Sequence, residues 1–233
     1  MKQWVLTLAI AMCLSAAATI LRAEDNVPPA GYKPLFNGKD LTGWKGLIDL
    51  PTRKKLDAEQ LAEAQKKADQ KMNEHWSVKD GLLIYDGKGA NLCTAEDYGD
   101  FELLVDWKIQ AGGDSGIYLR GCPQVQIWDP DWADYKRHEA FRGSGALWNN
   151  SKHERWPLVR ADKPVGEWNH FHIIMVGDKV TVHFNDKLVV KDTVMENIWE
   201  KGKPQMPAKG PIELQHHLHE LQFKNIFVKR LDK

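Results

Sequence analysis

Apolar and polar residues alternate strictly over residues 101–109, and this pattern limits the stretch to an extended strand. The apolar members are Phe101, Leu103, Val105, Trp107 and Ile109. Successive side chains of a β-strand point to opposite sides, so these residues share one face and Asp106 lies on the other. The stretch therefore predicts a strand with one side in a core and one polar side.

Short apolar runs separated by turn residues continue along the chain. We expect further strands at 76–78, 82–85, 168–176, 180–184, 187–193, 212–217 and 221–229. The first two are joined by Lys79-Asp80-Gly81, a typical hairpin turn. No repeat or linker divides the sequence. Many strands at close spacing predict an all-β fold, a β-sandwich, in a single domain that spans residues 24–233.

One segment has helical rather than strand periodicity. Asp57 and Gln60 fit a capping box, and apolar residues follow at helical spacing as Leu61, Ala64, Ala68 and Met72. The pattern predicts one inserted surface helix over about residues 57–74. Its charged residues suit a solvated face, and the thin, Ala-rich apolar stripe makes a lid or partner helix the weaker interpretation.

A glycine-rich turn followed by two strands with polar faces lies in the middle of the chain. The segment Gly112-Gly113-Asp114-Ser115-Gly116 predicts the turn, because glycine adopts positive φ at little cost and Asp or Ser can bond nearby backbone. Alternation places these polar or small residues on the non-core faces: Gly116, Tyr118, Arg120, Gln124, Gln126 and Trp128. A strand that only faced water would more often carry Lys, Glu and Thr, so we interpret this face as a binding surface.

A long stretch after Asp129 shows little periodicity and extends to Glu167. It is rich in aromatic residues, namely Trp132, Tyr135, Phe141, Trp148 and Trp156. A loop of this length in a compact domain is often functional. Aromatic rings can cover the apolar face of a sugar, but buried Trp is also ordinary core, so both interpretations stay open.

The first 23 residues have the features of a cleavable signal peptide. Lys2 precedes an apolar run from Val5 to Ile20, and small residues lie before Glu24. We therefore expect a secreted or periplasmic protein with no stable membrane insertion after cleavage. Removal of Lys2 and Arg22 leaves 30 basic and 32 acidic residues, a net charge of −2. This balance does not suit a nucleic-acid partner.

Two cysteines remain in the mature chain. Cys93 and Cys122 can form one disulfide in an oxidising compartment. Both lie in strand-like surroundings, where buried thiols are equally consistent with the sequence. The pairing stays open at this point.

Histidines form two groups, and the motifs of many common enzyme classes are absent. No Ser elbow, Walker loop, dinucleotide-binding glycine motif or paired-Cys knuckle occurs. His170 and His172 share one strand face, while His216, His217 and His219 lie near the C-terminus. Imidazoles from both groups can in principle hold a metal ion, although a strand His-x-His is more often structural.

A second polar row follows from the alternation in residues 213–217, which puts Glu213, Gln215 and His217 on one face. If the polar faces of the strands align across a sheet, the following residues converge on one patch: Asp106, Tyr118, Arg120, Gln124, Gln126, Gln215 and His217. Such a patch is the expected functional site.

Several motifs together resemble one family. They are residues 35–44 (LFNGKDLTGW), 112–120 (GGDSGIYLR), 125–127 (VQI), 145–147 (GAL), 166–169 (GEWN), and 210–215 (GPIELQ) with His217 and 223–226 (FKNI). In this order, over nearly the whole mature chain, they resemble the 3-keto-disaccharide hydrolase family. The resemblance implies a concanavalin A-like jelly-roll sandwich of two antiparallel sheets, in secreted or periplasmic bacterial proteins that act on glycosides.

This chain departs from the family pattern at two places. Gln124 stands where the family usually has Glu before Val-Gln, and an amide cannot serve as a base. The predicted helix at 57–74 is an insertion relative to the shorter members.

The resemblance also implies a reaction. A ketone at C3 of a sugar acidifies the C2 hydrogen, so a base can form the enolate, the C1 substituent leaves, and addition of water completes net hydrolysis. Such an enzyme needs a base, and hydrogen-bond donors or a divalent metal ion at the enolate oxygen. The expected base is His217 or Asp106. The residues expected to bind the carbohydrate substrate are Ser115, Tyr118, Arg120, Gln124, Gln126, Trp128, Trp148 and Gln215.

Two alternatives use the same scaffold. A non-catalytic, lectin-like carbohydrate-binding module would keep the polar and aromatic patch without a base. An ordinary endo-glycanase would need a strand with alternating carboxylates, and no Glu-x-Asp-x-x-Glu run occurs in this sequence.

Overall fold

The protein is described by a computed structural model that covers residues 24–197 and 206–231. The expected signal peptide, residues 1–23, lies outside this range. In the described part of the chain no helix is long and apolar enough to cross a membrane.

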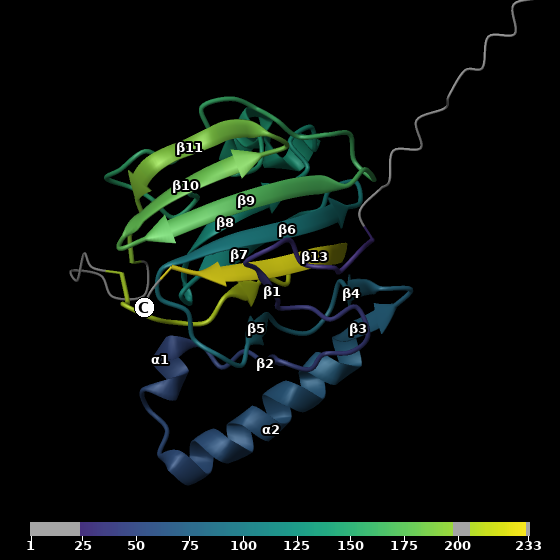
Figure 1. The fold of residues 1–233 in the computed structure, drawn as a ribbon, viewed down its shortest axis with the longest axis vertical. Coiled ribbons are helices and arrows are strands. Elements are labelled where there is room, and N and C mark those ends of the chain that lie inside the picture. The colour runs from purple at the N-terminus through teal and green to yellow at the C-terminus, as the bar shows by residue number, and fades with distance from the viewer. Residues whose placement is uncertain (1–23, 198–205, 232–233) are drawn as a thin grey trace, which may run out of the picture.

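Two antiparallel sheets form the body of the protein (Figure 1). The large sheet has the order β11-β10-β9-β6-β13-β4-β3, with β1 paired to β13, and the small sheet has the order β2-β5-β12-β7-β8. The strands of the large sheet are β1 (Lys33–Pro34), β3 (Trp76–Lys79), β4 (Leu82–Asp86), β6 (Phe101–Ile109), β9 (Asn169–Val176), β10 (Lys179–Phe184), β11 (Lys187–Val194) and β13 (Glu220–Arg230). Those of the small sheet are β2 (Trp44–Gly46), β5 (Leu92–Thr94), β7 (Asp114–Leu119), β8 (Cys122–Trp128) and β12 (Glu213–Leu214).

The core lies between the two sheets. Along β6 the alternation predicted from the sequence appears directly, because every second side chain from Phe101 to Ile109 is buried. Trp107 packs against Phe171 and Phe184 at ring-centroid distances of 5.5 and 5.6 Å. Each fully buried aromatic or large aliphatic side chain stabilises the fold by about 2–3 kcal/mol. The predicted jelly-roll sandwich of two antiparallel sheets is confirmed.

The inserted helix α2 (Ala58–His75) begins with the predicted capping box. The Asp57 side chain accepts from the Gln60 backbone N–H, and the Gln60 side chain accepts from that of Asp57. The helix lies against the β2 edge of the small sheet, where Gln65 donates to the Gly46 carbonyl and Asp69 accepts from its N–H. It therefore covers one edge strand and satisfies its backbone. A short helix, α1 (Leu50–Arg53), precedes it and was not expected.

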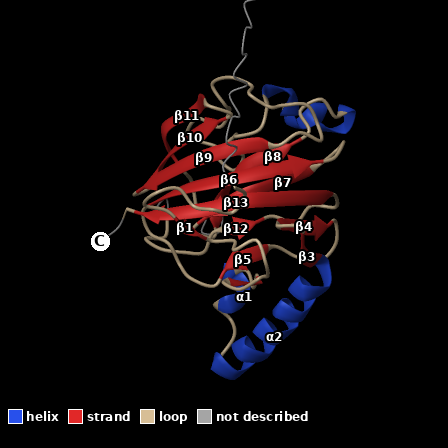
Figure 2. Cartoon of the chain, turned by 45° about the vertical axis from the view of Figure 1, so that its right-hand side comes forward, coloured by secondary structure: helices blue, strands red, loops and turns tan. Residues whose placement is uncertain are grey.

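The long stretch after β8 is ordered by hydrogen bonds rather than by periodic burial. It contains two 3₁₀ helices, η1 (Ala133–His138) and η2 (Ala140–Arg142), at the end of the sandwich opposite α2 (Figure 2). It then returns along β8, where Gln126 donates its backbone N–H to Ala146 and accepts from Gly145. Leu147 forms an isolated bridge with Val125. The stretch thus extends the small sheet by one short segment.

Cys93 and Cys122 are both buried thiols, and no disulfide joins them. Burial raises the pKa of the Cys93 thiol to about 12, so this group is neutral at physiological pH. The question left open by the sequence is thereby settled in favour of core thiols.

Candidate active site

The outward face of the small sheet brings most of the predicted polar residues together. Cross-strand pairs join Asp114 to Trp128, Gly116 to Gln126 and Tyr118 to Gln124. On the other side of β7, Glu213 pairs with Tyr118, and the Gln215 backbone N–H donates to Gly116. The expected residues that meet here are Tyr118, Gln124, Gln126, Trp128, Gln215 and His217.

A chain of side-chain amides crosses this face and ends on Asp114. Gln124 donates from Nε2 to Gln126 Oε1 at 2.6 Å, and Gln126 donates from Nε2 to Asp114 Oδ1 at 2.7 Å. Gly116 leaves room for the first amide, because a Cβ at this position would lie 2.5 Å from Gln124 Oε1. The chain of amides fixes the orientation of the Asp114 carboxylate.

Asp114 and His217 form a carboxylate–imidazole pair. Asp114 Oδ2 lies 3.7 Å from His217 Nδ1, an ion-pair separation that is too long for a hydrogen bond. Burial raises the pKa of Asp114, while the charge of His217 and the hydrogen bond from Gln126 act in the opposite direction. The Asp114 side chain is only 19% exposed, whereas that of His217 is 43% exposed. A proton on Nδ1 that faces Asp114 leaves Nε2 as the basic nitrogen on the accessible side.

Asp114 was not among the predicted site residues, because the sequence reading assigned it to the glycine turn. Alternation could have placed Asp114 on the polar face, because β7 already begins at this residue and residues 114, 116 and 118 share one face. The loop after β8 adds His138, whose charge also favours the ionised form of Asp114.

Glu213 and Tyr118 form the deeper end of the polar face. Glu213 is 3% exposed, and burial raises its pKa to about 7, opposed mainly by a long contact of 3.4 Å from Asn91 Nδ2. Burial also raises the pKa of Tyr118 to about 12, so its hydroxyl remains a hydrogen-bond donor at neutral pH. Gln215 Nε2 lies 3.5 Å from that hydroxyl.

Asp106 does not belong to this patch, and the expected convergence is wrong for this residue. It lies on β6 of the large sheet, on the face away from the core, whereas His217 follows β12 of the small sheet. Its carboxylate contacts His170 Nδ1 at 2.6 Å and accepts from Asn225 Nδ2 at 2.7 Å. The sandwich core separates it from the Asp114–His217 pair.

Arg120 was also expected on the binding face but lies in the β7–β8 turn. A register shift after Tyr118 breaks the alternation, and Arg120 and Gly121 adopt φ of 54° and 68°. The buried guanidinium donates to the carbonyls of Gly99, Gly177 and Pro207 and pairs with Asp100. Arg120 therefore joins turns of the scaffold instead of lining the site.

Ser115 is likewise turned toward the core. It is fully buried, and its hydroxyl donates to the Gln215 carbonyl at 2.8 Å. This bond fixes β7 to the segment after β12, so Ser115 positions Gln215 and is not accessible to a ligand.

Three tryptophans form a cluster beside the pair. Trp128 lies 5.2 Å from Trp148 and 6.5 Å from Trp156 between ring centroids. His138 packs edge-on against Trp148 at 5.7 Å. Trp128 is buried and supports the cluster from below, whereas Trp148 is only partly buried and is the ring available for stacking.

The two histidine groups lie on different sheets and do not form a joint metal site. His170 pairs with Asp106 and His172 with Glu102 on the large sheet, while His216 contacts Asn91 beside the small sheet. Within residues 24–197 and 206–231, no group of three or more His, Cys, Asp or Glu side chains is arranged to hold a metal ion.

Fold and site together define a jelly-roll protein with an acid–base pair on the outer face of its small sheet. A family model described as the 3-keto-alpha-glucoside-1,2-lyase-like domain matches residues 31–229. The chain belongs to this family, which confirms the resemblance found in the sequence.

Individual relatives agree with this assignment. The chain is 24% identical to the 3-keto-disaccharide hydrolase of Bacteroides thetaiotaomicron, over 87% of this chain and 79% of that protein. In fold it also resembles two crystal structures from Parabacteroides distasonis whose names describe glycosyl hydrolases. One has a TM-score of 0.67 at 24% identity, with 90% of this chain and all of the other covered. The second has a TM-score of 0.64 at 24% identity, with coverages of 86% and 99%.

Proposed function

We propose that this protein is a glycoside-acting hydrolase that cleaves the glycosidic bond of 3-keto-glycosides or 3-keto-disaccharides. The family supports the substrate class, since the curated relative bears the name 3-keto-disaccharide hydrolase. The single observation that carries the proposal is the Asp114–His217 pair, held by the amide chain on a face rich in sugar-compatible groups.

The reaction begins with removal of the C2 proton, which the neighbouring C3 ketone acidifies. His217 Nε2 takes that proton, and the C–H electron pair forms the enolate. Asp114 stabilises the resulting imidazolium through its negative charge. A positioned base of this kind contributes about 10²–10⁴-fold to a rate.

Collapse of the enolate expels the C1 substituent and leaves a C1–C2 double bond in the ketone. The proton that His217 took from C2 passes to the departing oxygen, which leaves as the aglycone alcohol, and His217 is again neutral. Water then adds with its oxygen at C1 and a proton at C2, so the balance is hydrolysis. Tyr118, whose hydroxyl is neutral, is the proposed donor to the developing enolate oxygen.

Position 124, where the family usually has Glu, carries an amide in this chain. In the proposed mechanism Asp114 supplies the carboxylate instead. Gln124 lies on the neighbouring strand and is linked to Asp114 through Gln126. Gln124 Oε1 and Gln215 Oε1 are buried and have no hydrogen-bond partner among the described residues. Buried polar atoms are normally paired, so these two oxygens mark the polar face as incompletely satisfied in the free protein, and the amides would have to turn outward to accept from sugar hydroxyls.

The test is incubation of the mature protein with a 3-keto-glucoside, with and without a chelator, followed by detection of the released aglycone. Release from the 3-keto-glucoside but not from the unoxidised glucoside supports the proposal. Binding without release would instead favour the lectin-like module, which needs the polar face but no base. Loss of release with the chelator alone would add a divalent metal ion to the mechanism.

We also propose that the enzyme is exported. The proposal rests on the charge, apolar run and small residues of the first 23 positions. N-terminal sequencing of the protein from the producing cells should find a start near Glu24, and retention of Met1 on cytosolic protein would contradict export.

A further inference from the structure

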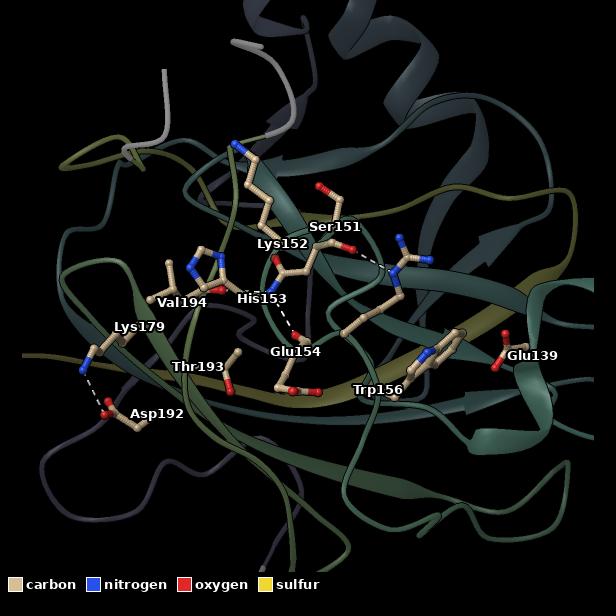
Figure 3. Close-up of a pocket in the computed structure, with 12 residues that line it drawn as sticks. Glu139, Ser151, Lys152, His153, Glu154, Trp156, Lys179, Asp192, Thr193 and Val194 are labelled. Atoms are coloured by element: carbon tan, nitrogen blue, oxygen red, sulfur yellow. Dashed lines mark hydrogen bonds and ion pairs between the residues drawn. The ribbon is translucent and has the colours of Figure 1, made fainter. Parts of the chain in front are cut away.

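A polar groove of about 770 Å³ lies beside the tryptophan cluster (Figure 3). One wall is the loop from Asn150 to Trp156, the opposite wall is formed by Lys179 and residues 192–194 at the β10–β11 end, and Glu139 lies at one end. None of these residues belongs to the catalytic pair described above.

The carboxylate of Glu196 anchors the loop that forms one wall. Glu196 accepts backbone hydrogen bonds from Ser151, Lys152 and His153 at 3.0, 2.6 and 2.8 Å. These bonds hold the pKa of Glu196 at about 2, well below its usual value. Asn150 donates from its side chain to the Val194 carbonyl at 2.8 Å and thereby ties the loop to β11. The groove is therefore preformed.

The end of the groove that carries Trp156 and Glu139 is the end nearest in contacts to the catalytic pair. The Trp156 ring lies 6.5 Å from that of Trp128, and Trp128 is the cross-strand partner of Asp114. Directly paired residues on antiparallel strands are about 5 Å apart. Glu139 follows His138, which contacts Trp148 and acts on Asp114. Trp128 and His138 thus connect the groove lining to the surroundings of Asp114, on the same side of the sandwich.

The lining indicates the chemistry of the ligand. Acidic and basic side chains are balanced, with Glu139, Glu154 and Asp192 against Lys152, Arg155 and Lys179. Asn150, Ser151, Thr193 and Trp156 add amide, hydroxyl and indole groups, and His153 and Val194 complete the lining. An anion or a cation would require an excess of one sign, and an apolar ligand would require an apolar wall. A neutral, extended ligand that is rich in hydroxyl groups can form hydrogen bonds with both the acidic and the basic side chains of this lining.

We infer that the groove is a subsite for an oligosaccharide leaving group, so that substrates longer than a disaccharide are preferred. This inference rests on the proposed function and extends it: the 3-keto sugar lies at His217, and the sugars on its C1 side lie along the groove. Hydrogen bonds made there contribute to binding both before and during the reaction, so they raise kcat/KM for longer substrates.

The first arm of the test compares kcat/KM for a 3-keto-disaccharide and a 3-keto-tetrasaccharide oxidised at the non-reducing end. The wild type should favour the tetrasaccharide by about tenfold, the effect of one or two net hydrogen bonds. Thr193→Trp, which fills the groove, should remove this preference and leave the disaccharide rate unchanged. Lys187→Trp, on an exposed part of β11 outside the groove, is the matched control.

Equal kcat/KM for both substrates in the wild type, or an equal loss for both in Thr193→Trp, would overturn the inference. A second arm separates it from the proposed function, because it needs no turnover. Calorimetric titration of His217→Ala with the unoxidised tetrasaccharide should give binding that Thr193→Trp in the same background abolishes. If the wild type cleaves no 3-keto substrate, the proposed function fails. Binding of the tetrasaccharide that Thr193→Trp abolishes would still support the groove as a saccharide subsite. Absence of that binding would overturn the subsite as well.

Discussion

The carboxylate of Asp114 lies 3.7 Å from the imidazole of His217, although Asp114 begins β7 and His217 follows β12. The two strands are neighbours in the small sheet, and the Ser115 hydroxyl bonds the Gln215 carbonyl between them. The backbone that places His217, the proposed base, is therefore fixed by the strand that carries its carboxylate partner.

Asp114→Asn should lower kcat on a 3-keto-glucoside by about 10²-fold or more, because the neutral amide no longer stabilises the imidazolium. Steady-state kinetics at constant pH measures the effect. Asp106→Asn is the matched control, since this carboxylate lies on the large sheet beside His170. If the two variants lose kcat equally, the assignment of Asp114 to the site is wrong.

Arg120→Lys should reduce the free energy of unfolding by about 2–4 kcal/mol, because a buried network of directed hydrogen bonds loses its planar donor. Chemical denaturation measures this loss. The exposed pair of Arg160 with Asp131 provides the control, and Arg160→Lys should change stability by about 1 kcal/mol or less. At a temperature where the Arg120 variant remains folded, its kcat/KM should stay close to that of the wild type. Weakened substrate binding without loss of stability would return Arg120 to the binding face.

Glu213→Gln should change how stability depends on pH. The folded pKa of about 7 lies above the ordinary value of about 4.3, so the native state binds the extra proton between these pH values. The stability that the neutral carboxyl group retains is fully present below about pH 4 and is lost as the pH rises through 7, by about 3–4 kcal/mol in total. The variant should therefore be more stable than the wild type at pH 8 and show a smaller decline from pH 5 to 8. Parallel curves for the two proteins, measured by denaturation, would contradict the raised pKa.

Gly116→Ala should disturb the amide chain, because the new Cβ would overlap Gln124 Oε1. We expect a loss of about 1–3 kcal/mol in the free energy of unfolding and a lower kcat. Gln124→Ala removes the overlapping group, so the double variant should lose less stability than the sum of the two single variants. Strict additivity in this double-mutant cycle would show that the two side chains do not compete for space.

The sandwich and the helix could be predicted because their signals are local. Period-2 alternation in β6 and the Asp57–Gln60 capping box each depend on neighbouring residues, and the structure confirms both. The common face of Tyr118 and Gln124 also follows from alternation once the strands are placed side by side. His217 lies beyond the end of β12, so its approach to Asp114 depends on the segment after that strand.

Three other features, the positions of Asp106 and Arg120 and the groove, could not be derived from local patterns. Alternation tells which face of a strand a residue occupies but not which sheet the strand joins, so Asp106 was grouped with residues of the other sheet. A register shift after Tyr118 and the Arg120-Gly121 turn end the alternation before Arg120, and the extended pattern predicted from the sequence did not allow for this turn. The groove depends on Glu196 bonding a loop distant in sequence, and such contacts have no periodic pattern.

The most direct test of the account follows the C2 hydrogen of a 3-keto-glucoside in deuterated water by NMR, for the wild type and for His217→Ala. The wild type should incorporate deuterium at C2 and release the aglycone, while the variant should bind the substrate but do neither. A variant with wild-type exchange and release would contradict the role of His217, and a wild type that binds the sugar without exchange or release would contradict the enzyme itself.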